Sequence, residues 1–464
     1  MSSFEATLIL PVSAQDAYDW HVRPGAFGRL NPPWEHVDVV ERHPGVYDGA
    51  VVKLRIRKGP VRIHWTLQHR DVEAGRRFVD EQLKGPFGSW VHTHAFDSAN
   101  GTATLRDHIE YDPPMGALGS VFAGGTLRSS LERLFAYRHA VTRDDLALHA
   151  RFAEKPRLTV AITGSSGLIG SALCDVFTTG GHTVRRLVRR PAKAEDEIQW
   201  DPQSDEAIPA LNDVDVIIHL AGENIASGRW TEDRKRRIRD SRVVGTRSLA
   251  AGLHKIDDPP TAFISASAMG FYGRERGEDC LTEDDEPGES FLAEVCTAWE
   301  AAAEPARELG LRVVHARIGV VLSPRGGALA KMLPAARTGT NAIIGHGRQF
   351  LSWVSQDDVV SGFYTLAMDD GLEGPFNLTA PQPASNEDFT RSLARVLHRP
   401  QLLRVPSSAV NALLGEMGGL LTDGACIVPS RLRQAGFEFR YPTLELALRH
   451  LLGKASRADE GLDS

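Results

Sequence analysis

A glycine-rich loop between a buried strand and a helix constrains this chain more than any other feature. The run LTVAIT (158–163) is typical of a buried strand, SALCDVFTTGG (171–181) is helical, and HTVRRLVRR (182–190) returns to a strand. In such a βαβ unit, glycines permit a tight turn, close approach of a pyrophosphate and tight helix packing, with the phosphates at the helix N-terminus. The loop residues predicted to bind a dinucleotide are Gly164, Ser165, Ser166, Gly167, Leu168, Ile169 and Gly170.

The end of the next strand indicates which dinucleotide is bound. Sites for NAD usually carry an acidic residue there to hold the ribose 2′-hydroxyl, whereas this chain has Arg189 and Arg190. Guanidinium groups pair with phosphate through two hydrogen bonds, so Arg189, with Arg190 as a second candidate, predicts NADP(H) as the cofactor. The alternative is that they are two solvated surface side chains.

Strands and helices continue to alternate beyond this unit, which predicts an α/β domain with a doubly wound parallel sheet. We assign residues 157–398 to this domain. Residues 399–453 are predicted to form a small C-terminal region on the substrate side, and residues 454–464 a disordered tail.

Residues 1–152 have a different pattern, which predicts an α+β domain. Short alternating runs separated by turn residues are typical of an antiparallel meander. They lie at 51–57, 61–70, 76–83, 90–97 and 103–112. A helical stretch follows, in which Leu127, Leu131, Leu134 and Phe135 recur at helical spacing. We therefore expect a long helix lying on a curved sheet.

Charge and cysteine spacing exclude several classes of protein. The chain has 60 acidic and 53 basic side chains and a net charge of −7, which predicts no nucleic-acid partner because a negative protein repels phosphate. Cys174, Cys280, Cys296 and Cys426 lack C-x-x-C spacing, so we expect neither a zinc site nor a disulfide framework. We find neither a signal sequence nor a run of about 18 apolar residues, so we expect a cytoplasmic protein without a membrane span.

Longer motifs between Leu158 and Leu452 resemble a known family. They are TGSSGLIG, LAGENIASGRWTEDRKRRIRDSRVVGTR, SASAMGFYG, FLAEVCTAWE, ARIGVVLSPRGGALAKML, GRQFLSWVSQDDVV, LLGEM and RLRQAGFEFRYP. This part of the chain is similar to the atypical short-chain dehydrogenase/reductases of the "epimerase family", which are nucleoside-diphosphate-sugar epimerase-like proteins with a C-terminal extension. The resemblance implies a Rossmann fold that binds NADP(H).

The resemblance also implies further site residues. The loop that passes the adenosine side of the cofactor corresponds to His219, Leu220, Ala221 and Gly222. Arg236 and Ser241 lie on the helix after it, where most of the basic side chains are expected to be solvated. Ser265, Ala266 and Ser267 correspond to the strand end beside the nicotinamide, and Arg317 is expected to approach the cofactor or substrate.

The catalytic residues depart from the family pattern. Active short-chain reductases use a Tyr-x-x-x-Lys pair, in which the lysine lowers the tyrosine pKa. The segment 290–296 has neither residue, and Arg276 stands four residues after Tyr272. Tyr272, with Ser267 as its hydroxyl partner, is the candidate catalytic pair, and the alternative is that Tyr272 packs beside the nicotinamide. Glu294 is a second candidate acid or base by position alone.

The segment GHGRQFLSWVSQDDVV (345–360) resembles the place where extended members of the family close a substrate pocket. Arg348 is a candidate for holding an anionic group, and Trp353 for stacking on a ring. In the alternative interpretation Trp353 is a core residue and Arg348 pairs with Asp357 or Asp358.

The N-terminal region resembles START-like, polyketide-cyclase-type (SRPBCC) domains. The resemblance rests on LPVSAQDAYDWHVRPGAFGRLNP, the strand meander and the terminal helix. It implies a helix-grip fold around a cavity that binds an apolar ligand. His92 and His94 alternate on one strand face, but the sequence shows no clear third metal ligand, so we expect polar or cavity-lining histidines and no metal.

These features lead to two hypotheses. The first is an NADP(H)-dependent oxidoreductase or epimerase-like enzyme that acts on a small-molecule substrate, with an N-terminal domain that captures an apolar ligand. The second is a catalytically inactive NADP(H)-binding protein that acts as a redox-responsive regulator or partner-binding module, because the Tyr-x-x-x-Lys pair is absent. Some relatives carry cell-division names, which supports the second hypothesis.

Overall fold

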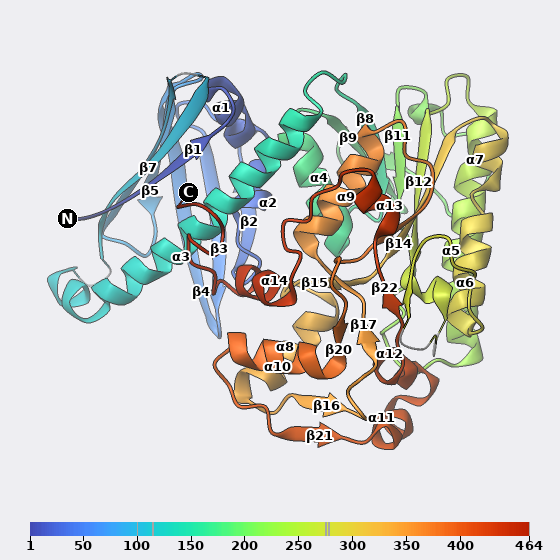
Figure 1. Cartoon of the computed structure of the whole chain (residues 1–464). Helices are drawn as coiled ribbons and strands as arrows, with labels where there is room; N and C mark the ends of the chain where they lie inside the picture. The colour runs from blue at the N-terminus through green and yellow to red at the C-terminus, as the bar shows by residue number, and fades with distance from the viewer. Residues whose placement is uncertain (100, 114–115, 274–275, 277–278, 464) are drawn as a thin grey trace. The chain divides into compact units, whose positions relative to one another are not determined.

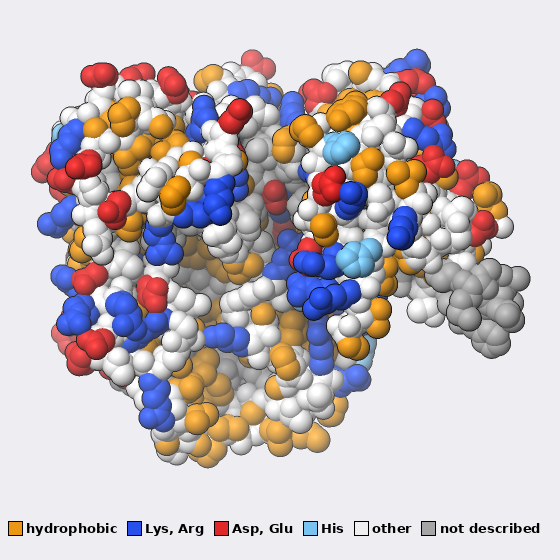
Figure 2. Space-filling model, turned by 180° about the vertical axis from the view of Figure 1, so that it is seen from behind, with side chains coloured by type: hydrophobic (Ala, Val, Ile, Leu, Met, Phe, Trp, Pro, Cys, Tyr) orange, Lys and Arg blue, Asp and Glu red, His pale blue; other side chains and the backbone are white. Residues whose placement is uncertain are grey.

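The structure is a computed structural model that describes residues 1–99, 101–113, 116–273, 276 and 279–463. The chain divides into two compact units. Unit 1 consists of Met1–Lys155, Asp175–Gly181 and Arg449–Ser464, and unit 2 of Pro156–Cys174 and His182–Leu448. Within the described ranges, we find no helix that combines the length and apolarity needed to cross a membrane. The face in Figure 2 carries both acidic and basic side chains.

Unit 1 is built on a seven-stranded antiparallel sheet with the order β1-β7-β6-β5-β4-β3-β2. The strands are β1 (Ser2–Leu10), β2 (His36–Arg42), β3 (Val51–Lys58), β4 (Val61–Glu73), β5 (Arg77–Lys84), β6 (Ser89–Ala99) and β7 (Thr102–Asp112). The helices are α1 (Ala14–Val22), α2 (Ala26–Leu30) and the long α3 (Gly116–Arg151). Figure 1 shows the curved sheet with α3 beside it, which confirms the predicted helix-grip fold.

The core of unit 1 follows from the alternation of its strands. Along β6, buried residues alternate with half-buried ones, so Trp90, His92, His94 and Phe96 all face inward. Leu131 and Phe135 of α3 pack in one cluster with Trp90 and with side chains of β1 and β7. The helical spacing seen in the sequence therefore marks the face that α3 buries.

Unit 2 is built on a seven-stranded parallel sheet with the order β10-β9-β8-β11-β12-β14-β19. The strands are β8 (Thr159–Thr163), β9 (Thr183–Val188), β10 (Glu197–Gln199), β11 (Val216–His219), β12 (Ala262–Ala268), β14 (Arg312–Ile318) and β19 (Gly374–Leu378). The longer helices are α4 (Leu168–Thr179), of which the residues up to Cys174 belong to unit 2, α5 (Glu232–Gly252), α6 (Phe291–Ala301), α8 (Gly327–Thr338), α9 (Gln356–Met368) and α10 (Asn386–Val396). The order reverses at β8, as in the predicted doubly wound fold.

The segment after α10 joins unit 2 through short strand pairs. β21 (Leu403–Val405) pairs with β16 (Ala342–Ile344), and β22 (Cys426–Ile427) pairs in parallel with β13 (Cys280–Leu281). The register places Cys280 opposite Cys426, and the two form a disulfide with a Cα–Cα distance of 4.4 Å. The prediction of no disulfide is therefore wrong, because strand pairing joins cysteines 146 residues apart, which spacing along the chain does not reveal.

The end of the chain, for which the sequence predicts disorder, forms turns with defined contacts inside unit 1. Arg457 donates a hydrogen bond to Thr7, and Leu462 packs against a core cluster that contains Tyr137. His450 forms an ion pair with Glu460 at 2.8 Å, and both side chains are buried. One apolar side chain and one buried ion pair therefore hold a mainly polar segment.

Candidate functional site

The glycine-rich loop lies where β8 ends and α4 begins, as predicted. Gly164 has φ +65°, which favours glycine, and its carbonyl accepts a hydrogen bond of 2.9 Å from Gly167 N. A Cβ on Gly170 would lie 2.3 Å from the Gly164 oxygen and 2.9 Å from Ser165 Cα. Only glycine fits this position, because backbone atoms leave no room for a side chain. The loop therefore has the close helix packing that a phosphate-binding turn needs.

The structure separates the two arginines that follow β9. Arg190 is held by Glu197, with two hydrogen bonds of 2.7 Å, and these bonds lower the pKa of Glu197 to about 2. Arg189 is exposed, and among the described residues its side chain has neither a hydrogen bond nor an ion pair. Arg189, the first candidate from the sequence, therefore has its guanidinium available for a ligand, whereas Arg190 is held by Glu197.

The loop after β11 is fixed to the end of β8 by Thr163. The Thr163 hydroxyl accepts hydrogen bonds from the backbone N–H groups of Leu220 and Ala221 at 2.9 and 3.1 Å. It also contacts Nδ1 of His219 at 2.9 Å. Burial lowers the pKa of His219 to about 3, so the imidazole is neutral. Sequence reasoning missed Thr163, although its position directly before Gly164 is a usable signal.

The other predicted residues of the loop after β11 differ in whether they lie beside the glycine-rich loop. His219 is fully buried beside Trp200, so its side chain belongs to the core, while the backbone of Leu220 lies 3.1 Å from the Cβ position of Gly164. Gly222 follows in the same loop and lies against the Arg242 guanidinium.

Helix α5 supports the loop through three side chains. Ser241 accepts a hydrogen bond of 3.0 Å from Glu223 N, and Arg242, which sequence reasoning missed, donates one of 3.0 Å to the Glu223 carbonyl. Arg234 pairs with the Glu223 carboxylate at 2.6 Å. Arg236 instead lies on the exposed face of α5, where it pairs with Asp233, so the structure does not bring it to the loop.

A buried polar network lies at the carboxyl ends of β12 and β14. Ser267 donates a hydrogen bond of 2.7 Å to Glu300 on α6, and Glu300 accepts two of 2.9 Å from Arg317. Arg317 also donates one of 3.0 Å to the Tyr272 hydroxyl, which in turn donates one of 2.7 Å to Asn377. Each member of this Ser267–Asn377 network therefore has a charged or polar partner inside the protein.

This arrangement differs from the predicted catalytic pair. Ser267 is not the hydroxyl partner of Tyr272, because Glu300 and Arg317 lie between them. Tyr272 is completely buried, and burial raises its pKa to about 12. Ser265 is also buried and bonds to the Ala266 carbonyl, so the predicted strand end is packed. Glu294 lies exposed on α6.

The two candidate substrate residues have different surroundings. Trp353, on β18 (Trp353–Ser355), is completely buried and donates a hydrogen bond of 3.0 Å to the Gln382 carbonyl, so the core alternative describes it. Arg348 is exposed, and within the described part of the chain its side chain pairs with no acidic group. Asp358 instead accepts hydrogen bonds from the backbone of Arg440 and Tyr441.

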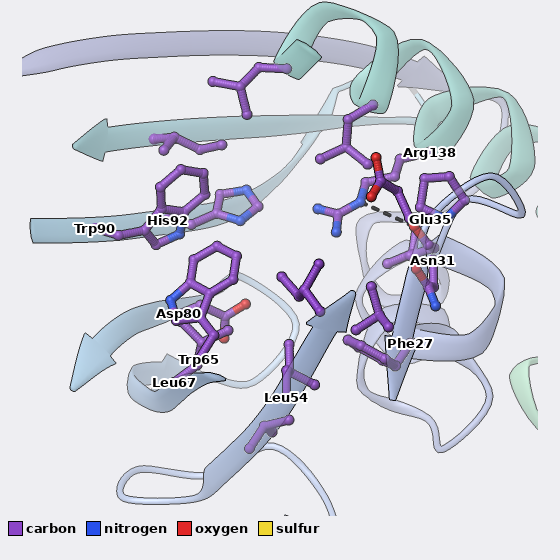
Figure 3. A pocket seen from close by; sticks show the side chains of 18 of the residues that line it. Phe27, Asn31, Glu35, Leu54, Trp65, Leu67, Asp80, Trp90, His92 and Arg138 are labelled. Carbon is purple, nitrogen blue, oxygen red and sulfur yellow. Dashed lines mark hydrogen bonds between the residues drawn. The ribbon is translucent and has the colours of Figure 1, made fainter. Parts of the chain in front are cut away.

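Unit 1 contains a cavity of about 570 Å³ between the sheet and the helices (Figure 3). Most of its lining is apolar and aromatic, including Leu54, Trp65 and Trp90. Arg138 of α3 points into it, across from Asp80 and His92 (Figure 3). An apolar cavity with a few polar groups is typical of a small-molecule binding site.

His92 and His94 line this cavity, as the sequence analysis expects. Burial lowers the pKa of His92 to about 4. For His94, the effect of burial is outweighed by hydrogen bonds to Asp107 and Asp80, which raise the pKa to about 9. No third ligand is evident beside them in the sequence, but the register of β5 with β6 places Asp80 opposite His92. A third candidate ligand, the Asp80 carboxylate, is therefore present and comes from the neighbouring strand.

Together, the parallel sheet, the glycine-rich turn and the strand-end loops define a Rossmann-type α/β protein, preceded by a helix-grip domain. Family models agree with this class. Residues 160–378 match the NAD dependent epimerase/dehydratase family, residues 405–451 a domain of unknown function (DUF1731), and residues 10–135 polyketide cyclase / dehydrase and lipid transport proteins.

Relatives and solved structures identify the family. An epimerase family protein of Mycobacterium bovis is 44% identical over 292 residues, which are 62% of this chain and 96% of the relative. The nucleoside-diphosphate sugar epimerase from Corynebacterium glutamicum is 32% identical with a TM-score of 0.81, covering 99% of this chain and 92% of that one. The human epimerase family protein SDR39U1, solved with NADPH, is 30% identical with a TM-score of 0.58, covering 64% and 100%. The chain belongs to the epimerase family.

Proposed function

We propose that unit 2 binds NADP(H), with the pyrophosphate on the Gly164–Gly170 loop and the 2′-phosphate on Arg189. One observation carries the choice of NADP(H). Arg189 is exposed at the end of β9 and forms no ion pair with any residue that the structure describes, while its neighbour Arg190 is paired with Glu197. The human relative solved with NADPH supports the same choice. Leu220, Ala221 and Gly222 would line the adenosine side through their backbone.

The proposed activity is an epimerase-like oxidoreductase reaction on a small-molecule substrate. Membership of the epimerase family and the glycine-rich turn support it. When bound, the nicotinamide supplies hydride transfer, and residues of this chain would orient the substrate beside it. Arg348 is exposed and pairs with no acidic group of the described ranges, so it is the residue that would hold an anionic group of the substrate. Unit 1 would bind an apolar ligand in its own cavity.

A second candidate function is NADP(H) binding without turnover. It is supported by the state of Tyr272, whose hydroxyl is buried and already bonded to both Arg317 and Asn377. A proton donor in a reductase must reach the substrate, and a tyrosine with a pKa near 12 whose hydrogen is already donated to Asn377 is poorly suited to this task.

The test of cofactor choice is a fluorescence titration with NADPH and with NADH. We expect wild-type protein to bind NADPH more tightly, and Arg189→Ala to weaken NADPH binding about 10- to 100-fold, because a charge-assisted hydrogen bond contributes about 1.5–3 kcal/mol. Binding of NADH should change less than twofold. Arg190→Ala is the matched control and should have the smaller effect on NADPH. Equal affinity of the wild type for both nucleotides would contradict the proposal.

The two candidate functions are separated by a turnover assay. NADPH oxidation is followed with a panel of small carbonyl and nucleotide-sugar substrates for wild type and Tyr272→Phe. An enzyme that uses Tyr272 loses turnover in the variant while its NADPH affinity stays the same. A protein that only binds NADP(H) shows no turnover in either form.

A further inference from the structure

Unit 1 brings together a group of histidines and aspartates from adjacent strands and from α3, here called the His–Asp cluster. It comprises Asp80 and His69, His92 and His94, and Asp107 and His139. The antiparallel register places Asp80 opposite His92 and Asp107 opposite His94, so β5, β6 and β7 each contribute across one face. None of these side chains belongs to the nucleotide site of unit 2.

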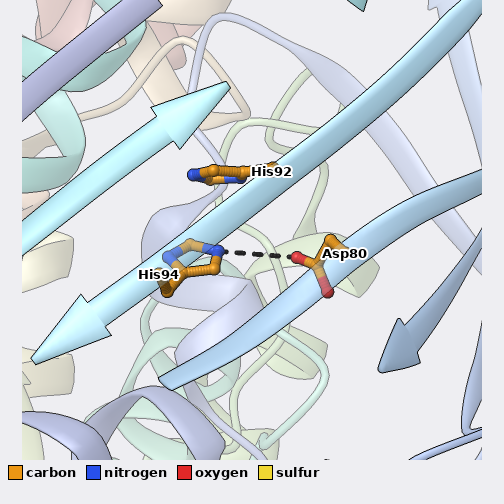
Figure 4. Close-up of side chains that lie close together, drawn as sticks. All are labelled: Asp80, His92 and His94. Atoms are coloured by element: carbon orange, nitrogen blue, oxygen red, sulfur yellow. Dashed lines mark ion pairs between the residues drawn. The ribbon is translucent and has the colours of Figure 1, made fainter. Parts of the chain in front are cut away.

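Three members of the cluster have the spacing of metal ligands. One ligand atom from each of Asp80, His92 and His94 lies within 4.8 Å of the others. His94 Nε2 is 3.5 Å from Asp80 Oδ2 (Figure 4). Ligands at about 2.1 Å from a tetrahedral ion are separated by about 3.4 Å, so the observed distance between these two atoms is that of a ligand pair.

Asp107 and His69 contact the atoms of these three side chains that do not face the proposed metal position. Asp107 Oδ1 lies 3.0 Å from His92 Nε2 and 2.8 Å from His94 Nδ1, and His69 Nδ1 contacts the second oxygen of Asp80. The atoms left for a metal are therefore His92 Nδ1, His94 Nε2 and Asp80 Oδ2. A carboxylate behind each ligand imidazole is the usual support of a metal site, because it fixes the ring and its tautomer.

Two carboxylates supply the negative charge of the cluster. Asp107 is 2% exposed, and within the described residues neither Asp80 nor Asp107 forms an ion pair with a lysine or arginine. Arg138 lines the same cavity, but its Nε donates to the Leu30 carbonyl instead. Buried carboxylates are normally balanced by a cation or coordinate a metal. Here they face the His94 imidazole, whose pKa they raise, and the more distant Arg138 guanidinium, so a bound metal ion would take the place of the proton on His94.

The three ligands also border open space. Asp80, His92 and His94 all line the 570 Å³ cavity, whose walls are otherwise mainly apolar. A metal held by two histidines and one carboxylate from one side keeps coordination positions free toward the cavity, as in catalytic zinc sites and two-histidine, one-carboxylate iron sites. A closed structural site would need a fourth protein ligand instead.

We propose that the helix-grip domain holds a divalent transition-metal ion of the Zn²⁺ class on Asp80, His92 and His94, with Asp107 and His69 as positioning residues. The open positions of the ion face the cavity, so a ligand bound there coordinates it through an oxygen or nitrogen atom while its apolar part contacts the walls. This proposal is independent of NADP(H) binding by unit 2.

The test uses the full-length chain, freed of metal by a chelator and titrated with Co²⁺. We expect one Co²⁺ per chain with the visible d–d absorption of a four- or five-coordinate nitrogen and oxygen site, and its loss on addition of Zn²⁺. His92→Ala, His94→Ala and Asp80→Asn should each weaken binding at least tenfold. The matched control is His64→Ala, because His64 is exposed on β4 of the same sheet.

The wild-type spectrum decides the question even where a variant fails to fold. Absence of d–d bands in the wild type overturns the proposal, as does equal Co²⁺ affinity in wild type and a folded His92→Ala variant. Asp107→Asn gives a further measurement. A positioning role predicts a metal affinity about 10- to 100-fold weaker with the stoichiometry of one ion retained.

Discussion

The glycine-rich turn of unit 2 and the His–Asp cluster of unit 1 are assembled in opposite ways. The turn comes from seven consecutive residues, Gly164 to Gly170, and its geometry depends on backbone that only glycine permits. The cluster comes from side chains on separate strands and depends on which residue lies opposite which. A contiguous site is therefore visible in sequence, whereas a site that depends on register becomes visible only when the strands are paired.

The polar groups of the two regions also differ in their partners. In unit 2, the Ser267–Asn377 network ties each side chain to another inside the protein. In unit 1, four members of the cluster border a cavity, namely His69, Asp80, His92 and His94. We infer that the first network stabilises its fold and the second is arranged for a ligand, and the predictions below test this contrast.

The largest expected effect is on stability, from Glu300→Ala. Glu300 is the only acidic partner of Arg317 among the described residues, and the Arg317 side chain is 5% exposed. Removing one partner of a buried ion pair leaves an uncompensated charge and costs about 3–5 kcal/mol. Urea unfolding should therefore show a large loss of free energy of unfolding.

The control for this prediction lies on the same helix. Glu294→Ala, at an exposed position of α6, should change the free energy of unfolding by less than about 0.5 kcal/mol. If Glu300→Ala were as stable as Glu294→Ala, the network would not be structural, and the contrast with the cluster of unit 1 would fail.

The next effect is on nucleotide binding, from Gly170→Ala. The added methyl would lie 2.3 Å from the Gly164 oxygen, so the turn must open or the helix must shift. We expect NADPH affinity to fall at least 100-fold, about 2.7 kcal/mol. Gly245→Ala is the matched control, because its Cβ would meet Pro202 at an ordinary 3.5 Å. Equal NADPH affinity in both variants would show that the turn does not bind the nucleotide.

Much of unit 2 is predictable from sequence because its signals are local. The alternation of strands and helices gives the doubly wound sheet, and the glycine spacing gives the turn. The contacts and burial of individual side chains depend instead on residues that are distant in the sequence. Arg189 and Arg190 are neighbours, yet only the pairing of β9 with β10 brings Glu197 to one of them. Tyr272 and Trp353 look like site residues in a motif, but tertiary packing buries both completely.

The same reasoning explains what was missed in unit 1. The alternation of His92 and His94 is visible in the sequence, but Asp80 lies twelve residues earlier and joins them only through the β5–β6 register. The disulfide of unit 2 has the same origin, since the pairing of β13 with β22 places its two cysteines opposite one another. Pairing between strands therefore accounts for both omissions.

The smallest effect concerns buried imidazoles, which differ between the regions. His94 of unit 1 lies between two carboxylates, whereas His219 of unit 2 contacts a threonine hydroxyl and aromatic rings. Burial lowers the pKa of His219 from 6.5 to about 3, so the unfolded chain takes up a proton that the folded one does not. The stability that His219 contributes is complete above pH 6.5 and is lost as the pH falls toward 3.

The low pKa of His219 predicts that the free energy of unfolding depends measurably on pH. Between pH 6 and pH 4, His219 should lower the free energy of unfolding by at most about 1.4 kcal/mol per pH unit. Urea unfolding of His219→Asn over this range should show a slope reduced by about that amount. His254→Asn, at an exposed position, is the control and should keep the slope of the wild type. If His219→Asn also kept it, His219 would be protonated in the folded protein, and burial without a carboxylate would not suffice to hold it neutral.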